Sequence, residues 1–308
     1  MIKSQELFPH AEPASNVPKG IIGVRIMGEH FWEIKQPRNS GMLRIMYGLT
    51  PRLTVMATSG ISNHHDRLLP KNIITHTHNG SQIIYYTNPK LYGKKYPYIF
   101  GGVNLYAKYR FLSKDGDGKH FRMALYGEYS YLTLAHDESE ADLMEDNSGY
   151  GGGLIATWLQ NKLAVSFTGG VIIPKKYSEQ TDLSGGYGTQ IVTTEMRYGT
   201  NFNYSLSMGY RLMPKKYSNY NETNYNIYVE LMGKYFEPTV IYQAGEKVNN
   251  TSPMLGRGYY LEAHPGIQKI IRSNTRIDLS FGMPLIKRSY THFYPFYYIG
   301  VQHYFYGK

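Results

Sequence analysis

The chain closes with a stretch that reads YYIGVQHYFY from Tyr297 to Tyr306. Alternate residues of this stretch share a face, because successive side chains of a β-strand point to opposite sides of the sheet. The second face carries small residues, polar residues and Tyr. The first face is aromatic and aliphatic and consists of Tyr297, Ile299, Val301, His303 and Phe305. A transmembrane β-barrel divides its strands in this way between lipid and lumen. The stretch therefore predicts the last strand of such a barrel.

The composition agrees with a barrel wall. The 308 residues include 31 Tyr and 32 Gly but no Cys, and Tyr is typical of the interfacial girdles of barrels. The mean hydropathy of -0.43 would suggest a soluble protein, but about half of the residues of a barrel wall face the lumen and can be polar. No run of about eighteen apolar residues occurs, so the sequence predicts no membrane-spanning helix.

The charge of the chain does not point to nucleic acid. The formal net charge is +10 and the isoelectric point is about 9.3, but the cations are scattered along alternating strands and form no patch. We therefore expect no nucleic-acid partner, and outer-membrane lipid and lipopolysaccharide as the surroundings. No apolar signal segment follows Met1, so we expect that a signal peptide has been removed from a protein of the Gram-negative outer membrane.

The alternation divides the chain into two parts. Residues 1–19 predict an irregular periplasmic segment able to enter the lumen, because Pro9, Pro13 and Pro18 interrupt any regular element. For residues 20–308 we expect the barrel, with about fourteen strands, and about twelve as the alternative. The fourteen expected strands cover residues 20–33, 42–50, 53–62, 100–113, 121–133, 151–159, 163–173, 190–199, 202–212, 225–235, 240–246, 259–271, 276–287 and 297–306.

Short and long connections alternate along the chain. The connection from His64 to Tyr98 is long, whereas short turns are expected near Pro51, Asn161, Asn201, Pro238 and Asn274. Bacterial outer-membrane barrels place short turns in the periplasm and long loops outside the cell. A β-sandwich gives no reason for this regularity, so we expect a closed antiparallel transmembrane barrel.

One hairpin carries a family resemblance. Residues Tyr47 to Leu53, which read YGLTPRL, resemble the YGLT-x-RL hairpin of outer-membrane channels grouped with the MetA pathway of phenol degradation. The strand plan also resembles transporter-type barrels of Bacteroidetes-type bacteria. The resemblance covers about a fifth of the chain at the level of motifs. It implies a porin-like barrel that passes small, often hydrophobic molecules.

The polar side of the expected strands predicts the lining of the lumen. Cations outnumber anions in this set, and a pore with such an excess favours anionic or polar solutes. The alternative is a network of salt bridges that stabilises the wall and leaves no open channel. The set consists of Arg25, Glu29, Arg44, Lys108, Arg110, Arg122, Glu128, Glu195, Arg197, Arg211, Glu230, Lys234, Glu262, Arg276 and Asp278.

Two loops carry residues that could bind metal ions. The long connection contains His64, His65, Asp66, His76 and His78, and such residues can hold zinc or copper. The acidic residues between 137 and 146 could hold calcium, although they lack the spacing of an EF-hand. A solvated loop is the other interpretation in both cases, and we assign no cofactor.

Catalytic signals are weak. No G-x-S-x-G elbow occurs, and the pair of His264 with Glu262 is the one candidate on the wall. We therefore expect a passive channel or transporter for small solutes and no enzyme. The alternatives are an interaction subunit, which docks a protein partner through residues 64–98 or the N-terminal segment, and a barrel-embedded hydrolase. The sequence does not name the solute.

Overall fold

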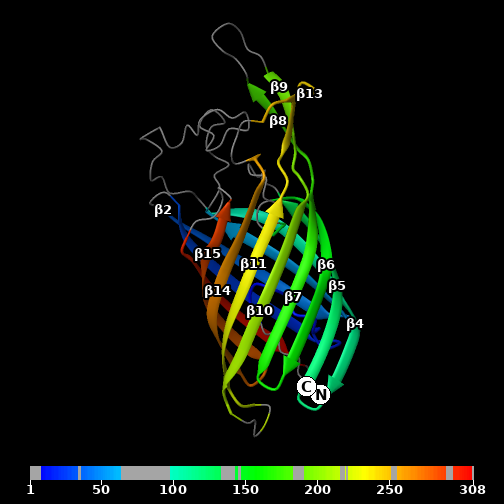
Figure 1. The fold of residues 1–308 in the computed structure, drawn as a ribbon, viewed down its shortest axis with the longest axis vertical. Helices are drawn as coiled ribbons and strands as arrows, with labels where there is room; N and C mark the ends of the chain where they lie inside the picture. Colours follow the sequence, from blue (N-terminus) through cyan, green and yellow to red (C-terminus); the bar gives the residue numbers. More distant parts are fainter. Residues whose placement is uncertain are drawn as a thin grey trace.

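The computed structural model describes residues 8–33, 36–63, 98–132, 143–144, 147–182, 191–215, 219, 221–250, 255–288 and 294–306. These residues form two antiparallel sheets, a closed barrel and a smaller sheet of four strands (Figure 1). Within these ranges, no helix is long and apolar enough to cross a membrane.

Twelve strands form the barrel, in the order β1-β16-β15-β14-β11-β10-β7-β6-β5-β4-β3-β2. The closing strand expected at the end of the chain is β16, and its Phe305 pairs with Ile22 at the start of β1. The closed antiparallel barrel is thereby confirmed. The strands are β1 (Ile22–Glu33), β2 (Gln36–Gly48), β3 (Leu53–Ser62), β4 (Ile99–Gly116), β5 (Lys119–Leu132), β6 (Gly149–Gln160), β7 (Leu163–Pro174), β10 (Asn201–Met213), β11 (Asn224–Phe236), β14 (Gly258–Ile271), β15 (Thr275–Arg288) and β16 (Phe296–Phe305).

The two faces of the wall follow the alternation of the sequence. On β4, Val103, Leu105 and Tyr109 are exposed on the outside, whereas Asn104 and Lys108 are buried on the inside. An arginine or lysine facing lipid at the midplane of a membrane costs about 2–4 kcal/mol. This cost explains why the outer face of the strand is apolar and why its charged residue points inward.

The expectation of about fourteen strands is wrong, and the alternative of twelve is correct. Residues 191–197, 240–243 and 246, which fall within two of the expected strands, belong instead to the second sheet, which Figure 1 shows beyond one end of the barrel. Its strand order is β13-β12-β9-β8, with β8 (Tyr177–Asp182), β9 (Ile191–Arg197), β12 (Val240–Gln243) and β13 (Glu246–Val248). β9 leads directly into β10, and β11 leads directly into β12, so the turns expected near Asn201 and Pro238 are also wrong.

Gly199 and Pro238 mark the place where these long strands leave the wall. A Cβ atom on Gly199 would lie 2.5 Å from the carbonyl oxygen of Glu237, so the two backbones approach too closely for a side chain. Pro238 has no N–H and cannot donate to a strand ladder. Because Gly and Pro are also the usual residues of hairpin turns, the sequence does not distinguish this bend from a turn.

The short turns gather at the opposite end of the barrel, which we call the terminal end because β1 begins and β16 ends there. In the turn between β2 and β3, the hydroxyl of Thr50 accepts hydrogen bonds from the backbone N–H groups of Arg52 at 3.1 Å and Leu53 at 2.9 Å. The turns between β6 and β7 and between β14 and β15 lie at the same end. The end that carries the second sheet is called the loop end.

Candidate functional site

The N-terminal segment, residues 8–20, lies inside the barrel. It forms no regular structure, so its backbone donors need partners among the side chains of the wall. The N–H of Ala11 donates to Glu230 Oε1 at 2.8 Å, and that of Ala14 donates to Thr157 Oγ1 at 2.8 Å. These bonds reach β11 and β6, so the segment contacts well-separated parts of the wall. We call residues 8–20 the luminal segment.

The luminal segment enters and leaves at the terminal end. Phe8 packs against Ala164, near the start of β7. Further along the segment, the N–H of Val17 donates to Thr54 Oγ1 at 3.0 Å, at the start of β3, and Gly20 donates to the carbonyl of Gly48. The intervening residues reach the middle of the wall, so the segment is a loop with its apex at residues 10–12.

Glu12, at this apex, forms ion pairs with two cationic side chains of the wall. Its carboxylate lies 2.7 Å from Arg44 Nη1 and 3.2 Å from Lys108 Nζ, and the same ammonium donates to the carbonyl of Pro13 at 2.7 Å. Burial alone would raise the pKa of Glu12, but Lys108 and Arg44 lower it to about 2. The carboxylate is therefore ionised at neutral pH, and the contact is an ion pair. We call Glu12, Arg44 and Lys108 the apex clamp.

A second cluster surrounds His10. Its ring nitrogen Nε2 lies 2.8 Å from Ser280 Oγ, and its ring packs against that of His264 at 4.5 Å between centroids, with the two planes tilted by 46°. His264 Nε2 in turn lies 2.8 Å from Glu262 Oε2, so the pair noted in the sequence is in contact. Burial, followed by His264 and Arg25, lowers the pKa of His10 well below its usual value. His10 is therefore neutral at pH 7.

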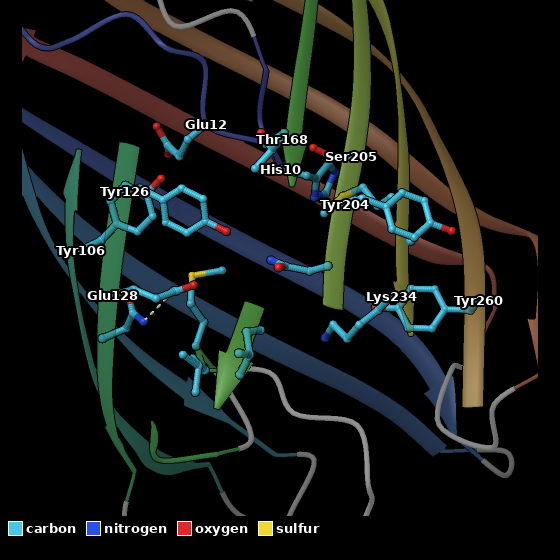
Figure 2. A pocket seen from close by; sticks show the side chains of 18 of the residues that line it. His10, Glu12, Tyr106, Tyr126, Glu128, Thr168, Tyr204, Ser205, Lys234 and Tyr260 are labelled. Atoms are coloured by element: carbon cyan, nitrogen blue, oxygen red, sulfur yellow. Dashed lines mark hydrogen bonds between the residues drawn. The ribbon is translucent and has the colours of Figure 1, made fainter. Parts of the chain in front are cut away.

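A cavity of about 200 Å³ lies on the loop-end side of the apex (Figure 2). Figure 2 shows Tyr106 and Tyr126 on one side, Lys234 and Tyr260 on the other, and the apex of the luminal segment beside them. The rings of Tyr106 and Tyr126 stack at 5.2 Å between centroids with an angle of 14°. We call this cavity the vestibule. Its lining includes His10, Glu12, Arg44, Asn104, Tyr106, Tyr126, Glu128, Thr168, Asn203, Ser205, Lys234 and Tyr260.

The structure places most of the residues expected in the lumen on the inner face of the wall. Eight of them are buried: Arg25, Arg44, Lys108, Glu230, Lys234, Glu262, Arg276 and Asp278. Glu29, Arg110, Arg122, Glu128 and Arg211 are partly exposed. Opposite charges meet directly in places, as at Arg276 Nε and Asp278 Oδ2, which are 2.7 Å apart.

Glu195 and Arg197 do not line the lumen, which corrects the expectation from the sequence. Both lie on β9 in the second sheet, where Arg197 Nε is 2.6 Å from Glu195 Oε1 and Lys176 Nζ is 2.7 Å from Glu195 Oε2. Hydrogen bonds from Lys176 and Arg197 lower the pKa of Glu195. The strand alternates as a wall strand does, so the sequence pattern did not reveal that it lies outside the barrel.

The candidate metal ligands of the sequence lie outside the described residues. These are His64, His65, Asp66, His76 and His78, together with the acidic residues of the loop between 137 and 146. Among the residues that the structure does describe, no group of three His, Asp or Glu side chains is arranged to hold a metal ion.

Sequence reasoning missed the luminal residues Glu12 and His10 and the vestibule residues Tyr126 and Asn203. Periodicity identifies strand faces, but the luminal segment has no period. Its signal is different: a Pro-interrupted stretch with one carboxylate, Glu12, precedes a wall rich in inward cations. The glycines facing Tyr126 gave a second signal, because wall glycines often accommodate an aromatic ring.

Known structures share the fold of this chain but little of its sequence. No protein-family model and no curated protein matches it. It aligns with the COG4313 outer membrane channel from Pseudomonas putida F1 over 97% of this chain and 100% of that one, at 14% identity and a TM-score of 0.57. It also aligns with the NanC porin over 91% of this chain and 98% of that one, at 11% identity and a TM-score of 0.45. The toluene transporter TbuX of Ralstonia pickettii aligns over 94% of this chain and 90% of that one, at 12% identity and a TM-score of 0.41.

Only the first of these likenesses exceeds a TM-score of 0.5, and at 14% identity it concerns the fold. Together with the apolar outer face and polar interior, it defines the class of the protein. The chain is a closed antiparallel β-barrel that shares the fold of that outer membrane channel.

Proposed function

We propose that the chain is an outer-membrane channel that passes small solutes passively. The observation that supports this most directly is the vestibule, a cavity inside a closed barrel with polar and charged walls. Barrels of this kind place their substrate path inside the lumen. The luminal segment lies beside the vestibule and narrows the path toward the terminal end.

The sidedness follows from the connections. Short turns of bacterial barrels lie in the periplasm and long loops lie outside. The terminal end, with its turn at Thr50 to Leu53, would then face the periplasm, and the luminal segment would enter the barrel from there. The loop end, with the second sheet, would face the exterior and contact lipopolysaccharide.

The cationic side chains on the inner face of the wall should make the pore selective for anions. Arg110 and Arg122 lie on neighbouring strands near the terminal end, where Arg110 Nη2 donates to the carbonyl of Pro51 at 2.9 Å and Arg122 Nη2 lies 3.3 Å from Asp115. Two arginines and one carboxylate leave a net positive charge at this point of the path. Like charges lining a pore attract counter-ions and set its selectivity.

Conductance in planar lipid bilayers tests this function. We expect small current steps and a reversal potential that favours anions across a salt gradient. Replacing Arg110 and Arg122 together by Gln should reduce the anion preference, whereas Arg197→Gln in the second sheet should not. Absence of current from a correctly folded barrel would favour an interaction subunit, and cation preference would show that the assignment of inward charges is wrong.

A hydrolase remains the second candidate because of one contact. Ser280 Oγ lies 2.8 Å from His10 Nε2, the spacing of a serine and its general base. Ser280 lies on β15, where the luminal segment brings His10 against it, and His10 also contacts His264 of the pair of His264 and Glu262. Ester hydrolysis by the purified barrel, abolished in Ser280→Ala, would support this alternative.

A further inference from the structure

We propose that the outer face of the barrel at the loop end binds a phosphate group of lipopolysaccharide through Arg257 and Arg288. The site lies on β15, β14, β11 and β10, which are neighbours in the wall and lie side by side in Figure 1. This inference rests on the proposed function, which turns the loop end toward the exterior, because lipopolysaccharide occupies only the outer leaflet of the outer membrane.

A row of outward side chains crosses these four strands. Backbone pairing places Arg288, Tyr259, Tyr235 and Phe202 in register, from β15 to β10. Side chains opposite each other on neighbouring strands share a face of the sheet, and this face is the outer one, since Phe202 is 48% exposed and its neighbour Asn201 is buried. The row is therefore an aromatic surface with a cation at one end. We call these four residues the girdle strip.

The side chains of the girdle strip contact one another. The guanidinium carbon of Arg288 lies 5.1 Å from the centre of the Tyr259 ring. The rings of Tyr235 and Phe202 are 6.3 Å apart between centroids. A guanidinium over an aromatic ring is held by a cation–π contact, so the strip presents its positive charge at a fixed place.

A second cation on β14 gives the depth of the strip in the membrane. Lys269 Nζ lies 5.4 Å from the centre of the Tyr225 ring, near the terminal end. Ten residues of β14 separate Lys269 from Tyr259, and ten residues of antiparallel strand span about 34 Å. A strand tilt of about 40° reduces this to about 26 Å along the membrane normal, close to the apolar band of about 25 Å in outer-membrane barrels. The girdle strip therefore lies at one edge of this band, where lipid headgroups begin.

The outer face of β14 agrees with this depth. Its outward residues between Tyr259 and Lys269 are all uncharged, namely Leu261, Ala263, Pro265 and Ile267. Charge is excluded from the part of a barrel wall that faces acyl chains. Arg288 is therefore placed to meet headgroups and not acyl chains.

A second arginine borders the girdle strip. Arg257, which directly precedes Gly258 at the start of β14, contacts Glu237 Oε2 with Nη2 at 2.8 Å and Nε at 3.3 Å. The other oxygen of Glu237 accepts a hydrogen bond from the Tyr235 hydroxyl at 2.7 Å. A Cβ atom on Gly258 would lie 2.9 Å from the carbonyl oxygen of Arg288, so the backbones that carry the two arginines are adjacent. Both guanidinium groups therefore border the tyrosines of the strip.

The chemistry of these side chains suits a phosphate. A guanidinium group carries five N–H donors in a planar fork that matches a phosphate, and the contact of Arg257 with Glu237 uses two of them. The cation–π contact of Arg288 with Tyr259 engages no hydrogen-bond acceptor. Both side chains are exposed, so both can donate to a phosphate while they keep their present contacts. Two guanidinium groups beside one carboxylate leave a net positive charge.

The surface below the arginines explains why the phosphate belongs to a lipid. Phe202, Tyr204 and Leu206 of β10 are exposed on the outer face and continue from the girdle strip into the apolar band. Acyl chains attached to the bound phosphate group would cover them and remove apolar surface from contact with water. A free phosphate would use the arginines alone, and would therefore bind more weakly.

Four probes test this assignment on the full chain in detergent, with the apparent dissociation constant measured by native mass spectrometry. They are lipid A (the phosphorylated anchor of lipopolysaccharide), dephosphorylated lipid A, phosphatidylglycerol and inorganic pyrophosphate. We expect lipid A to bind at least about tenfold more tightly than each of the others, because a charged hydrogen bond is worth about one such factor. Equal binding of dephosphorylated lipid A would show that phosphate is not recognised. Equal binding of phosphatidylglycerol or pyrophosphate would show a site for any anionic lipid or for a free anion, and each of these results would overturn the proposal.

Two variants assign the phosphate to the arginines. Arg257→Gln and Arg288→Gln should each weaken the binding of lipid A about tenfold and leave that of dephosphorylated lipid A unchanged. Lys269→Gln is the matched control, because it removes a cation from the ring of Tyr225 near the other end of the wall, and it should change nothing. An equal loss in Lys269→Gln would show that lipid A follows positive charge in general and would contradict the site. Should a variant fail to fold, as shown by its mobility on unheated gels, the ranking of the probes on the native chain still decides.

The failure of this inference and of the channel function can be told apart. Conductance without preference for lipid A would overturn the lipid site and leave the channel standing. Preference for lipid A without conductance would retain the site and refute the channel. A loop end that protease finds only from the periplasmic side would overturn the assignment to lipopolysaccharide without affecting conductance.

Discussion

Glu12→Gln should release the luminal segment from the wall. The change removes the negative charge that lies 2.7 Å from Arg44 and 3.2 Å from Lys108, whose side chains are 10% and 0% exposed. Removing one partner of a buried ion pair costs about 3–5 kcal/mol, because the other charge stays buried without compensation. Because Glu12 itself is 13% exposed and borders the vestibule, water can partly replace it, and we take the lower value of about 3 kcal/mol. Because about 1.4 kcal/mol corresponds to a factor of ten in an equilibrium constant, the ratio of released to wall-bound luminal segment should rise roughly a hundredfold.

Single-channel recording measures this release directly. We expect Glu12→Gln to show frequent openings to a larger conductance than the native chain, because the segment no longer narrows the lumen. Glu246→Gln, the same chemical change at an exposed position of β13, is the matched control and should behave as the native chain. Identical open-level conductance and frequency in Glu12→Gln and the native chain would refute the argument that this clamp holds the segment.

The same clamp predicts a dependence on pH. The pKa of Glu12 is lowered to about 2, against an ordinary value of 4.5. A carboxyl group with a lowered pKa stabilises the seated state above its ordinary pKa, and this contribution is lost as the pH falls toward the lowered value. The larger openings should therefore increase between about pH 4.5 and pH 2 in the native chain, and Glu12→Gln should not show this increase.

Three further predictions concern the wall and its orientation. Leu279→Arg, on the outer face and paired with Ile299, should lower the free energy of unfolding of the inserted barrel by about 2–4 kcal/mol, measured by urea unfolding from vesicles. Leu163→Arg, at the terminal end, should lower it by only about 0–1 kcal/mol. Equal costs of the two changes would show that the assigned depth is wrong. Gly170→Ala should cost about 1–3 kcal/mol by the same measurement, because its Cβ would overlap a tyrosine hydroxyl. Gly169→Ala, whose Cβ would have ordinary contacts, is its control. Protease added to intact cells should cut within residues 64–98 and spare the Thr50 turn, and the reverse pattern would invert the orientation.

The alternation of the sequence was sufficient for the barrel and for most of its inner face. Lipid excludes charge from one side of each strand, so a residue such as Lys108 or Asp278 is assigned to the lumen from its neighbours alone, and both are buried there. The same pattern failed for Glu195 and Arg197, because a strand that continues beyond the membrane keeps its alternation. The strand count was too high for the same reason.

The sequence by itself determined the class of fold, because a period of two with one apolar face is a local property of each strand. Only the tertiary structure decided what fills the lumen. The contacts of Glu12 with Arg44 and Lys108, and the register that aligns Tyr126 with Lys234, join residues that lie far apart along the chain. Such contacts depend on how the wall closes and where an irregular segment fits inside it, and no local pattern records either.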